Sequence, residues 1–176
     1  MKAIIINGGN SLTSRVVGVE QEIGKLFQRA NVSFNTINVH LLPAEDLITA
    51  NYNSPIILEN IKKVEEADIV VLITPVYKGA YSGILKTFLD LLPQKGLQGK
   101  VVLPVAVGGS IAHLLSIDYA LRPVAAILGA TTILPSVYVV DKQVQKVDGG
   151  FTVEQDVVER LENSFHTVFE QSKVNS

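Results

Sequence analysis

The sequence predicts a three-layer, doubly wound α/β protein, in which helices cover both faces of a sheet of five parallel strands in the order 2-1-3-4-5. Three observations support this fold. Short β-type runs alternate with longer helical segments, as in consecutive β-α units. The run DIVVLIT, Asp68–Thr74, is almost wholly apolar, which is typical of a central parallel strand buried on both faces. The 176 residues, 47% of them hydrophobic, suit one domain spanning residues 1–176.

The first part of the chain predicts a strand, a helix and a second strand. Ala3–Asn7 (AIIIN) is a short apolar run and the first expected strand. In Ser14–Ala30 the apolar residues recur at helical spacing, which predicts the first helix. Ser33–Val39 (SFNTINV) alternates between polar and apolar residues, so we expect a half-exposed strand at an edge of the sheet.

The middle of the chain predicts two helices around the central strand. Ser54–Glu66 is the second expected helix, with Ser54 as its N-cap and Pro55 at its first position. The third expected helix, Ser82–Leu92, follows the central strand Asp68–Thr74.

The last part of the chain predicts two strands and two helices. They are strand Lys100–Val107, helix Ala112–Leu128, strand Thr131–Val139 and closing helix Val153–Ser172. Pro104 is unfavourable for pairing inside a strand, and Pro135 suggests an edge position for the fifth strand. The segment VDKQVQKVDGGF predicts a hairpin-like loop that ends at Gly149-Gly150.

Composition and charge exclude several classes of function. A formal net charge of −2 provides no basic field for nucleic acid or anionic lipid. The absence of cysteine excludes disulfides, a thiol nucleophile and a cysteine-ligated metal. No apolar run approaches the roughly 20 residues that cross a bilayer. The start, MKAIIINGGN, is too short and too polar for a signal peptide, so we expect a cytoplasmic protein.

Three loops are expected to meet at one ligand site. In the predicted strand order the topological switch point lies between the first and third strands, and ligands bind there at the carboxyl ends of the strands. The loops that reach this edge are Gly8–Ser14, Pro75–Ser82 and Gly108–His113.

The first loop, NGGNSLTSR, has the composition of an anion site. Its glycines permit a sharp turn, and its hydroxyl groups stand near a helix amino end, where free N–H groups and the helix dipole favour an anion. A monophosphate suits this loop better than a dinucleotide, because G-x-G-x-x-G is absent. The alternative is an ordinary tight turn with a serine or threonine cap. The candidate binding residues are Gly8, Gly9, Ser11, Thr13, Ser14 and Arg15.

The second loop, PVYKGAYS, predicts contacts to a planar ring. Tyr77 and Tyr81 offer flat amphipathic surfaces. The alternatives are that the tyrosines pack against a neighbouring helix or subunit and that Lys78 is a solvated charge. The candidate binding residues are Pro75, Val76, Tyr77, Lys78, Gly79 and Ser82.

The third loop, VGGSIAH, offers backbone N–H groups to the polar edge of a ring. Its candidate binding residues are Gly108, Gly109, Ser110 and His113. A lone histidine at a helix start is also commonly a hydrogen-bonded structural residue. The three histidines lack the spacing of metal ligands, and no Ser-His-Asp set is present. We therefore assign no metal ligand and no catalytic side chain.

The helix expected at Ala112–Leu128 has two unusual features. It is apolar on nearly all sides, which one sheet face cannot fully bury, so a subunit interface is a reasonable hypothesis. It also contains Pro123, whose ring conflicts with the carbonyl of Tyr119. We expect a bend or bulge between these two residues, or two shorter helices.

The segments TPVYKGAYSGILKTFLDLLP, LQGKVVLPVAVGG and AHLLSIDYALRPV resemble the NAD(P)H-dependent FMN reductases of two-component alkanesulfonate monooxygenase systems. The resemblance runs more weakly from Met1 to about Asp141. It implies a flavodoxin-like fold with FMN held by the three loops, reduction by NADPH or NADH, and release of reduced FMN to a partner monooxygenase. It also implies a homodimer or homotetramer, with Tyr119 matching an interface tyrosine beside the flavin.

One motif departs from that family. Its phosphate loop usually reads G-S-x-R-x-x-S, whereas here Gly9 replaces the serine and Ser11 replaces the arginine. The phosphate thereby loses a bidentate cationic ligand, for which Arg15 or backbone amides must compensate. Two other readings remain: an FMN-bound reductase of quinones or azo compounds, and a flavodoxin-like electron carrier. The net charge of −2 argues against the carrier, since such proteins often dock through a strongly acidic face.

Overall fold

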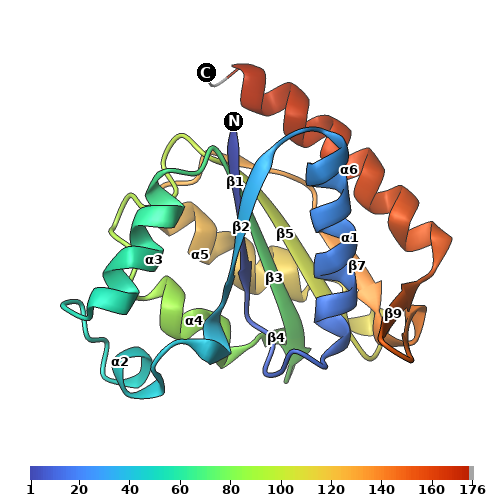
Figure 1. Ribbon diagram of the computed structural model, residues 1–176, viewed down its shortest axis with the longest axis horizontal. Helices are drawn as coiled ribbons and strands as arrows, with labels where there is room; N and C mark the ends of the chain where they lie inside the picture. Colours follow the sequence, from blue (N-terminus) through green and yellow to red (C-terminus); the bar gives the residue numbers. More distant parts are fainter. Residues whose placement is uncertain (175–176) are drawn as a thin grey trace.

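The computed structural model describes residues 1–174 and has three layers (Figure 1). The parallel sheet is formed by β1 (Lys2–Asn7), β2 (Ser33–Asn38), β3 (Ile69–Tyr77), β5 (Val101–Gly108), β6 (Thr132–Ile133) and β7 (Val137–Val140). The order is β2-β1-β3-β5, followed by β6 and β7, which pair with successive parts of β5. The predicted order 2-1-3-4-5 is therefore confirmed, with β6 and β7 together as the fifth strand.

Helices cover both faces of the sheet (Figure 1). On one face lie α1 (Arg15–Arg29) and α6 (Gln155–Val174); on the other lie α3 (Pro55–Glu65), α4 (Gly83–Leu89) and α5 (Arg122–Ile127), with the short α2 (Ala44–Ile48) beside α4. Ser54 caps α3 by accepting a hydrogen bond from the Ile57 N–H, as expected. Helix α2 was not predicted, because five residues are too few to show helical periodicity.

The sheet separates two hydrophobic clusters, and β3 contributes to both. Val70 and Leu72 face the cluster under α3 and α4, whereas Val71 and Ile73 face the cluster under α1 and α6. This alternation confirms that the apolar run is a central strand, because successive side chains of a strand point to opposite faces. All four side chains are fully buried, and burial of each stabilises the fold by about 1.5–3 kcal/mol.

A single break in the pairing between β5 and the fifth strand accommodates two prolines, Pro104 and Pro135. The Val102 carbonyl accepts a hydrogen bond from the Leu134 N–H, and residues two apart in a strand face the same neighbour. Pro104 therefore faces the fifth strand where Pro135 separates β6 from β7. No N–H of β5 is needed at that point, so Pro104 is tolerated inside a central strand.

The expected helix Ala112–Leu128 is wrong as a single element. Its first turn is a 3-10 turn at Ile111–His113, and only Arg122–Ile127 is α-helical. Between them lies a π-helical turn, Ile117–Leu121, in which the Arg122 N–H donates to the Ile117 carbonyl five residues back. The bulge expected beside Pro123 is confirmed, because a helix that meets a proline must rearrange its hydrogen bonds.

Two hairpins change the expected boundaries. Strand β3 continues past Thr74 and pairs with β4 (Ala80–Tyr81) through a two-residue turn at Lys78–Gly79. Strands β8 (Val144–Val147) and β9 (Gly150–Val153) form the expected hairpin, with its turn at Asp148–Gly149 and Gly150 already in β9, and the closing helix begins at Gln155 instead of Val153. None of the described helices is both long and apolar enough to span a membrane.

Candidate active site

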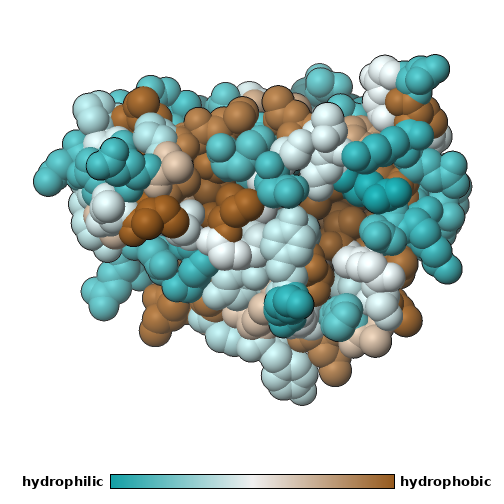
Figure 2. All heavy atoms as spheres, turned by 90° about the horizontal axis from the view of Figure 1, so that it is seen from below, coloured by the Kyte–Doolittle hydropathy of each residue, from teal (hydrophilic) through white to brown (hydrophobic). Residues whose placement is uncertain are grey.

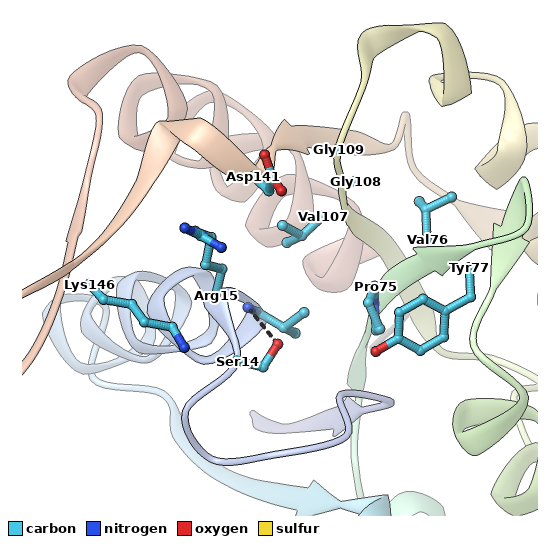
Figure 3. Close-up of a pocket in the computed structure, with 11 residues that line it drawn as sticks. Ser14, Arg15, Pro75, Val76, Tyr77, Val107, Gly108, Gly109, Asp141 and Lys146 are labelled. Atoms are coloured by element: carbon cyan, nitrogen blue, oxygen red, sulfur yellow. Dashed lines mark hydrogen bonds between the residues drawn. The ribbon is translucent and has the colours of Figure 1, made fainter.

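A cleft of about 240 Å³ opens at the carboxyl ends of the central strands. This is the end of the molecule seen in Figure 2, where hydrophobic side chains reach the surface between hydrophilic ones. The lining residues come from the start of α1, the end of β3, the end of β5 and the segment after β7. They are Ser14, Arg15, Val16, Pro75, Val76, Tyr77, Val107, Gly108, Gly109, Asp141 and Lys146 (Figure 3).

The three predicted loops therefore meet, but only part of each faces the cleft. Seven predicted residues line it: Ser14, Arg15, Pro75, Val76, Tyr77, Gly108 and Gly109. The other predicted residues lie outside its lining: Gly8, Gly9, Ser11, Thr13, Lys78, Gly79, Ser82, Ser110, His113 and Tyr119.

The glycines of the first loop use their backbone groups inside the protein. The Gly8 N–H donates to the Ile73 carbonyl at 2.8 Å, and the Gly9 N–H donates to Asn7 Oδ1 at 2.7 Å. Asn7, fully buried at the end of β1, thus shapes the loop. It was missed in the sequence because nothing distinguishes it from any polar residue that ends a strand.

The side chains after these glycines form a turn that leads into α1. Ser11 Oγ and Thr13 Oγ1 are 2.9 Å apart, and Ser11 Oγ accepts from the Thr13 N–H at 3.0 Å. Ser14 is the N-cap, and its Oγ accepts from the Val16 N–H at 3.4 Å. Arg15 donates from Nε to the Val144 carbonyl at 2.9 Å, which ties the start of α1 to β8.

Behind the first loop, Asn7 Nδ2 donates to the Glu20 carboxylate on α1. Burial raises the pKa of Glu20 above its ordinary value of 4.5, and the hydrogen bonds from Asn7 and Thr36 oppose that rise. The folded state therefore holds the Glu20 proton more tightly than the unfolded state does. In the pH range between the ordinary pKa and the raised pKa, raising the pH lowers the free energy of unfolding.

We expect Glu20→Gln to stabilise the protein at pH 7 and to have almost no effect below the ordinary pKa of glutamate. The glutamine keeps an oxygen that can accept from Asn7, but it carries no charge to desolvate. Urea unfolding of both proteins at pH 4 and pH 7 measures the difference. A variant that is less stable than the parent at pH 7 would contradict this account.

The second loop is mostly an extension of the sheet. Pro75, Val76 and Tyr77 belong to β3, and they form one wall of the cleft (Figure 3). Lys78 and Gly79 form the hairpin turn, with φ values of 52° and 76°. Such positive φ angles at both central positions are those of a type I′ hairpin turn, and this places both residues beyond the cleft.

Ser82 was expected to line the cleft, but it is a buried residue with a structural role. Its side chain is fully buried. Its Oγ donates to the Gly8 carbonyl at 2.6 Å and accepts from the Leu85 N–H at 3.1 Å, as the N-cap of α4. The serine therefore joins the first loop to the second, and its hydroxyl is already engaged on both sides.

Tyr138, on β7, holds the third loop in position. Its hydroxyl donates to the Ser110 carbonyl at 2.7 Å. Burial, and then the charge of Asp141, raise the pKa of Tyr138, so this hydroxyl stays protonated. Gly109 lines the cleft, whereas Ser110 caps the following turn and His113 is exposed beyond it.

Two charged residues of the cleft were not among the predicted ones. Asp141 follows β7 and lies near Gly109, whereas Lys146 comes from β8 and extends toward Ser14 (Figure 3). Both belong to the segment VDKQVQKVDGGF, whose pattern indicated only a hairpin. Lys146 approaches the cleft because the hairpin packs on α1 at Gly18, whereas Asp141 is placed by the pairing of β7 with β5. Among the described residues, no group of histidine and acidic side chains is placed to hold a metal ion.

The architecture agrees with comparisons to known proteins. The family described as NADPH-dependent FMN reductase matches residues 1–145. The chain belongs to the NADPH-dependent FMN reductase family. It is 41% identical to an FMN reductase (NADPH) of Pseudomonas putida over 97% of this chain and 85% of the relative. It is 42% identical to an FMN reductase (NADPH) of Escherichia coli over 82% of this chain and 75% of the relative.

Solved structures support the same assignment. The apo form of an NADH:FMN oxidoreductase (EMOB) superposes with a TM-score of 0.85 at 33% identity, covering 95% of this chain and 87% of that one. An archaeal flavodoxin, at 15% identity and a TM-score of 0.66, shares the fold. This FMN reductase family member is thus an oxidoreductase that uses FMN and a reduced pyridine nucleotide, and its flavodoxin-like fold is confirmed.

The residues of the cleft fit FMN. Pro75 and Tyr77, on the same side of β3, offer a largely apolar wall for a ring system, and Val76 lies between them. Ser14 and the amino end of the 15-residue helix α1 offer a hydroxyl and N–H groups for a phosphate. Gly109 presents backbone without a side chain, which suits contacts to the polar edge of a ring.

Proposed function

We propose that this protein reduces FMN as an exchangeable substrate and releases reduced FMN to a flavin-dependent monooxygenase that serves sulfonate sulfur assimilation. The proposal rests mainly on how open the cleft is. Its volume of about 240 Å³ is smaller than the roughly 300–1,000 Å³ of most small-molecule pockets. Its wall residue Tyr77 remains exposed. A cleft of this kind covers a flavin only in part, which favours exchange over permanent retention.

The chemistry requires positioning more than proton transfer. FMN, when bound, accepts a hydride from the reduced nicotinamide. The wall Pro75–Tyr77 would orient the ring from one side and leave its other side open to the nucleotide. Ser14 and the start of α1 would hold the phosphate, and backbone N–H groups of the Gly108–Gly109 loop would stabilise the negative charge of the reduced ring. No side chain of the cleft is assigned an acid or base role.

The visible spectrum and the oxidation of nucleotide test the proposal. We expect the purified protein to be colourless and to oxidise NADPH or NADH only when FMN is added. FAD, riboflavin and a quinone serve as alternative acceptors. A yellow protein that is active only with quinone would point to the quinone reductase, and the absence of nucleotide oxidation under every condition would refute both enzymes. Relatives named for NADPH and for NADH make both nucleotides necessary in the assay.

We also propose that the protein forms a homodimer or homotetramer through the π-helical turn. Tyr119 in this turn is 80% exposed, and the residues before it expose further apolar side chains. These are Ile111, Leu114 and Leu115. The turn also contacts β4, next to the wall of the cleft. An interface here would bring a second copy of Tyr119 toward that wall.

We expect Tyr119→Ala to weaken self-association by about tenfold or more, because tyrosines are common hot spots of interfaces. Sedimentation velocity over a range of protein concentrations measures the change, and FMN titration shows whether flavin affinity changes with it. Tyr52→Ala is the control, since Tyr52 is also exposed but lies beside the end of α4, where its hydroxyl donates to the Asp90 carbonyl. Sedimentation and FMN affinity equal to those of the parent would argue against the interface.

A further inference from the structure

We propose that Lys146, on the β8–β9 hairpin, is a cationic ligand of the FMN phosphate and the residue that makes this protein prefer FMN to riboflavin. The inference rests on the proposed binding of FMN in the cleft. It assigns a role to the hairpin, which the sequence pattern left without one.

The hairpin is held against α1 by a close contact at Gly18. A Cβ atom at this glycine would lie 2.7 Å from Val144 Cγ1 and 2.8 Å from the Phe151 Cβ. Val144 is fully buried, and Lys146 pairs with Phe151 across the hairpin. A glycine inside a helix costs roughly 0.5–1 kcal/mol relative to alanine; here it lets β8 and β9 pack directly on the helix. Lys146 is therefore carried by a docked strand and not by a free loop.

The docked hairpin brings two cations to the same end of the cleft. Residues 8–14 contain no lysine or arginine. Arg15 is oriented by its Nε bond to the Val144 carbonyl, and Lys146 extends toward Ser14 from the same hairpin (Figure 3). Pro75 and Tyr77 lie on the opposite side of the cleft in the same view. The ring wall and the cationic end are thus at opposite sides.

In the part of the chain that the structure describes, neither cation is paired with a carboxylate. Among the described residues, no acidic side chain forms an ion pair with Arg15 or Lys146, whereas Lys25 and Lys86 pair with carboxylates at 2.7 Å and 2.6 Å. Asp141 also lines the cleft, but it lies toward Gly109. Two unpaired like charges at one site repel each other, and a bound anion relieves that repulsion. A phosphate dianion beside Ser14 fits this end of the cleft.

Both substrates of the reaction carry phosphate groups. The structure favours the FMN phosphate as the one that binds at the cationic end. The cationic end adjoins the N-cap of α1, across the cleft from the wall proposed for the flavin ring. FMN and riboflavin differ only in the phosphate, so their relative affinities isolate its contribution. NADPH and NADH likewise differ by one phosphate, so their ratio reports any contact of Lys146 with the nucleotide.

Flavin binding to the Lys146→Gln variant tests the inference. FMN and riboflavin affinities are measured by quenching of flavin fluorescence in the absence of nucleotide. We expect FMN to bind about tenfold more weakly, the order of one charged hydrogen bond, while riboflavin affinity stays unchanged. Lys146→Arg should restore most of the preference for FMN. Lys142→Gln, which removes an exposed lysine four residues away that does not line the cleft, should behave as the parent protein.

Salt provides a second readout. The ratio of FMN to riboflavin affinity should fall with ionic strength in the parent and change less in Lys146→Gln, because salt screens an exposed charge. A ratio equal to that of the parent would overturn the inference, as would an equal loss in Lys142→Gln. A change confined to the ratio of NADPH to NADH turnover would overturn it in favour of a nucleotide contact. In each of these cases the parent protein would still reduce flavin. The inference about Lys146 can therefore fail while the proposed function stands.

Discussion

Replacing Ser82 with alanine should lower the free energy of unfolding by about 3 kcal/mol, since it removes an N-cap and leaves a buried carbonyl without a partner. The Ser82 hydroxyl caps α4 and donates to the Gly8 carbonyl at 2.6 Å, and its side chain is fully buried. Gly8 is also buried, so water could replace the lost donor only if the loops shift. Because this hydrogen bond joins the first loop to the second, we also expect FMN to bind more weakly.

Urea unfolding and FMN titration measure the two effects of Ser82→Ala. Ser110→Ala is the control, because Ser110 also caps a helical turn but lies exposed. Its cost should stay below about 1 kcal/mol. If Ser82→Ala unfolds at the same urea concentration as Ser110→Ala, the buried bridge contributes nothing beyond an ordinary cap.

Replacing Gly108 with alanine should cost about 2–3 kcal/mol, because the added methyl group would overlap a neighbouring side chain. The new Cβ would lie 2.0 Å from the Tyr138 hydroxyl oxygen and 3.2 Å from Val76 Cβ. That hydroxyl donates to the Ser110 carbonyl, so displacing it also displaces the third loop. We therefore expect FMN affinity to fall together with stability.

A double-mutant cycle with Tyr138→Phe identifies the cause. Removing the hydroxyl removes the closest clash, so Gly108→Ala with Tyr138→Phe should be more stable than the sum of the two single changes predicts. Gly83→Ala is the control, since a Cβ there meets no atom within 4 Å. Strictly additive unfolding energies would show that the phenol oxygen is not the obstacle.

The arrangement of the sheet could be predicted because it follows from local patterns. The unbroken apolar run Asp68–Thr74 indicated a central strand, and the alternation in Ser33–Val39 indicated an edge, and both are confirmed. The break of the fifth strand was not predicted, and neither was the division of Ala112–Leu128 into a 3-10 turn, a π-helical turn and a short α-helix. Prolines mark the places where regular pairing fails, but tertiary packing decides how the chain continues around them.

The sequence predicted which loops form the cleft better than it predicted which side chains line it. Strand order alone brings the three loops together, so their meeting could be inferred. Whether a hydroxyl faces the cleft or the interior depends on partners distant in sequence, as for Ser82 with Gly8. Lys146 reaches the cleft only because β8 docks at Gly18, more than a hundred residues earlier in the chain. A contact between residues so far apart in the chain leaves no periodic pattern in the sequence.

The continuation of β3 into the wall of the cleft has a kinetic consequence. Pro75 and Val76 are held by the ladders to β4 and β5, so this surface exists before any ligand arrives. Binding a ring against it orders few residues, and the loss of conformational entropy on association is small. Since this wall need not fold over the ligand, nothing there has to reopen before release. We therefore expect short residence times for the flavin, set by the strength of its phosphate contacts and not by a gating motion.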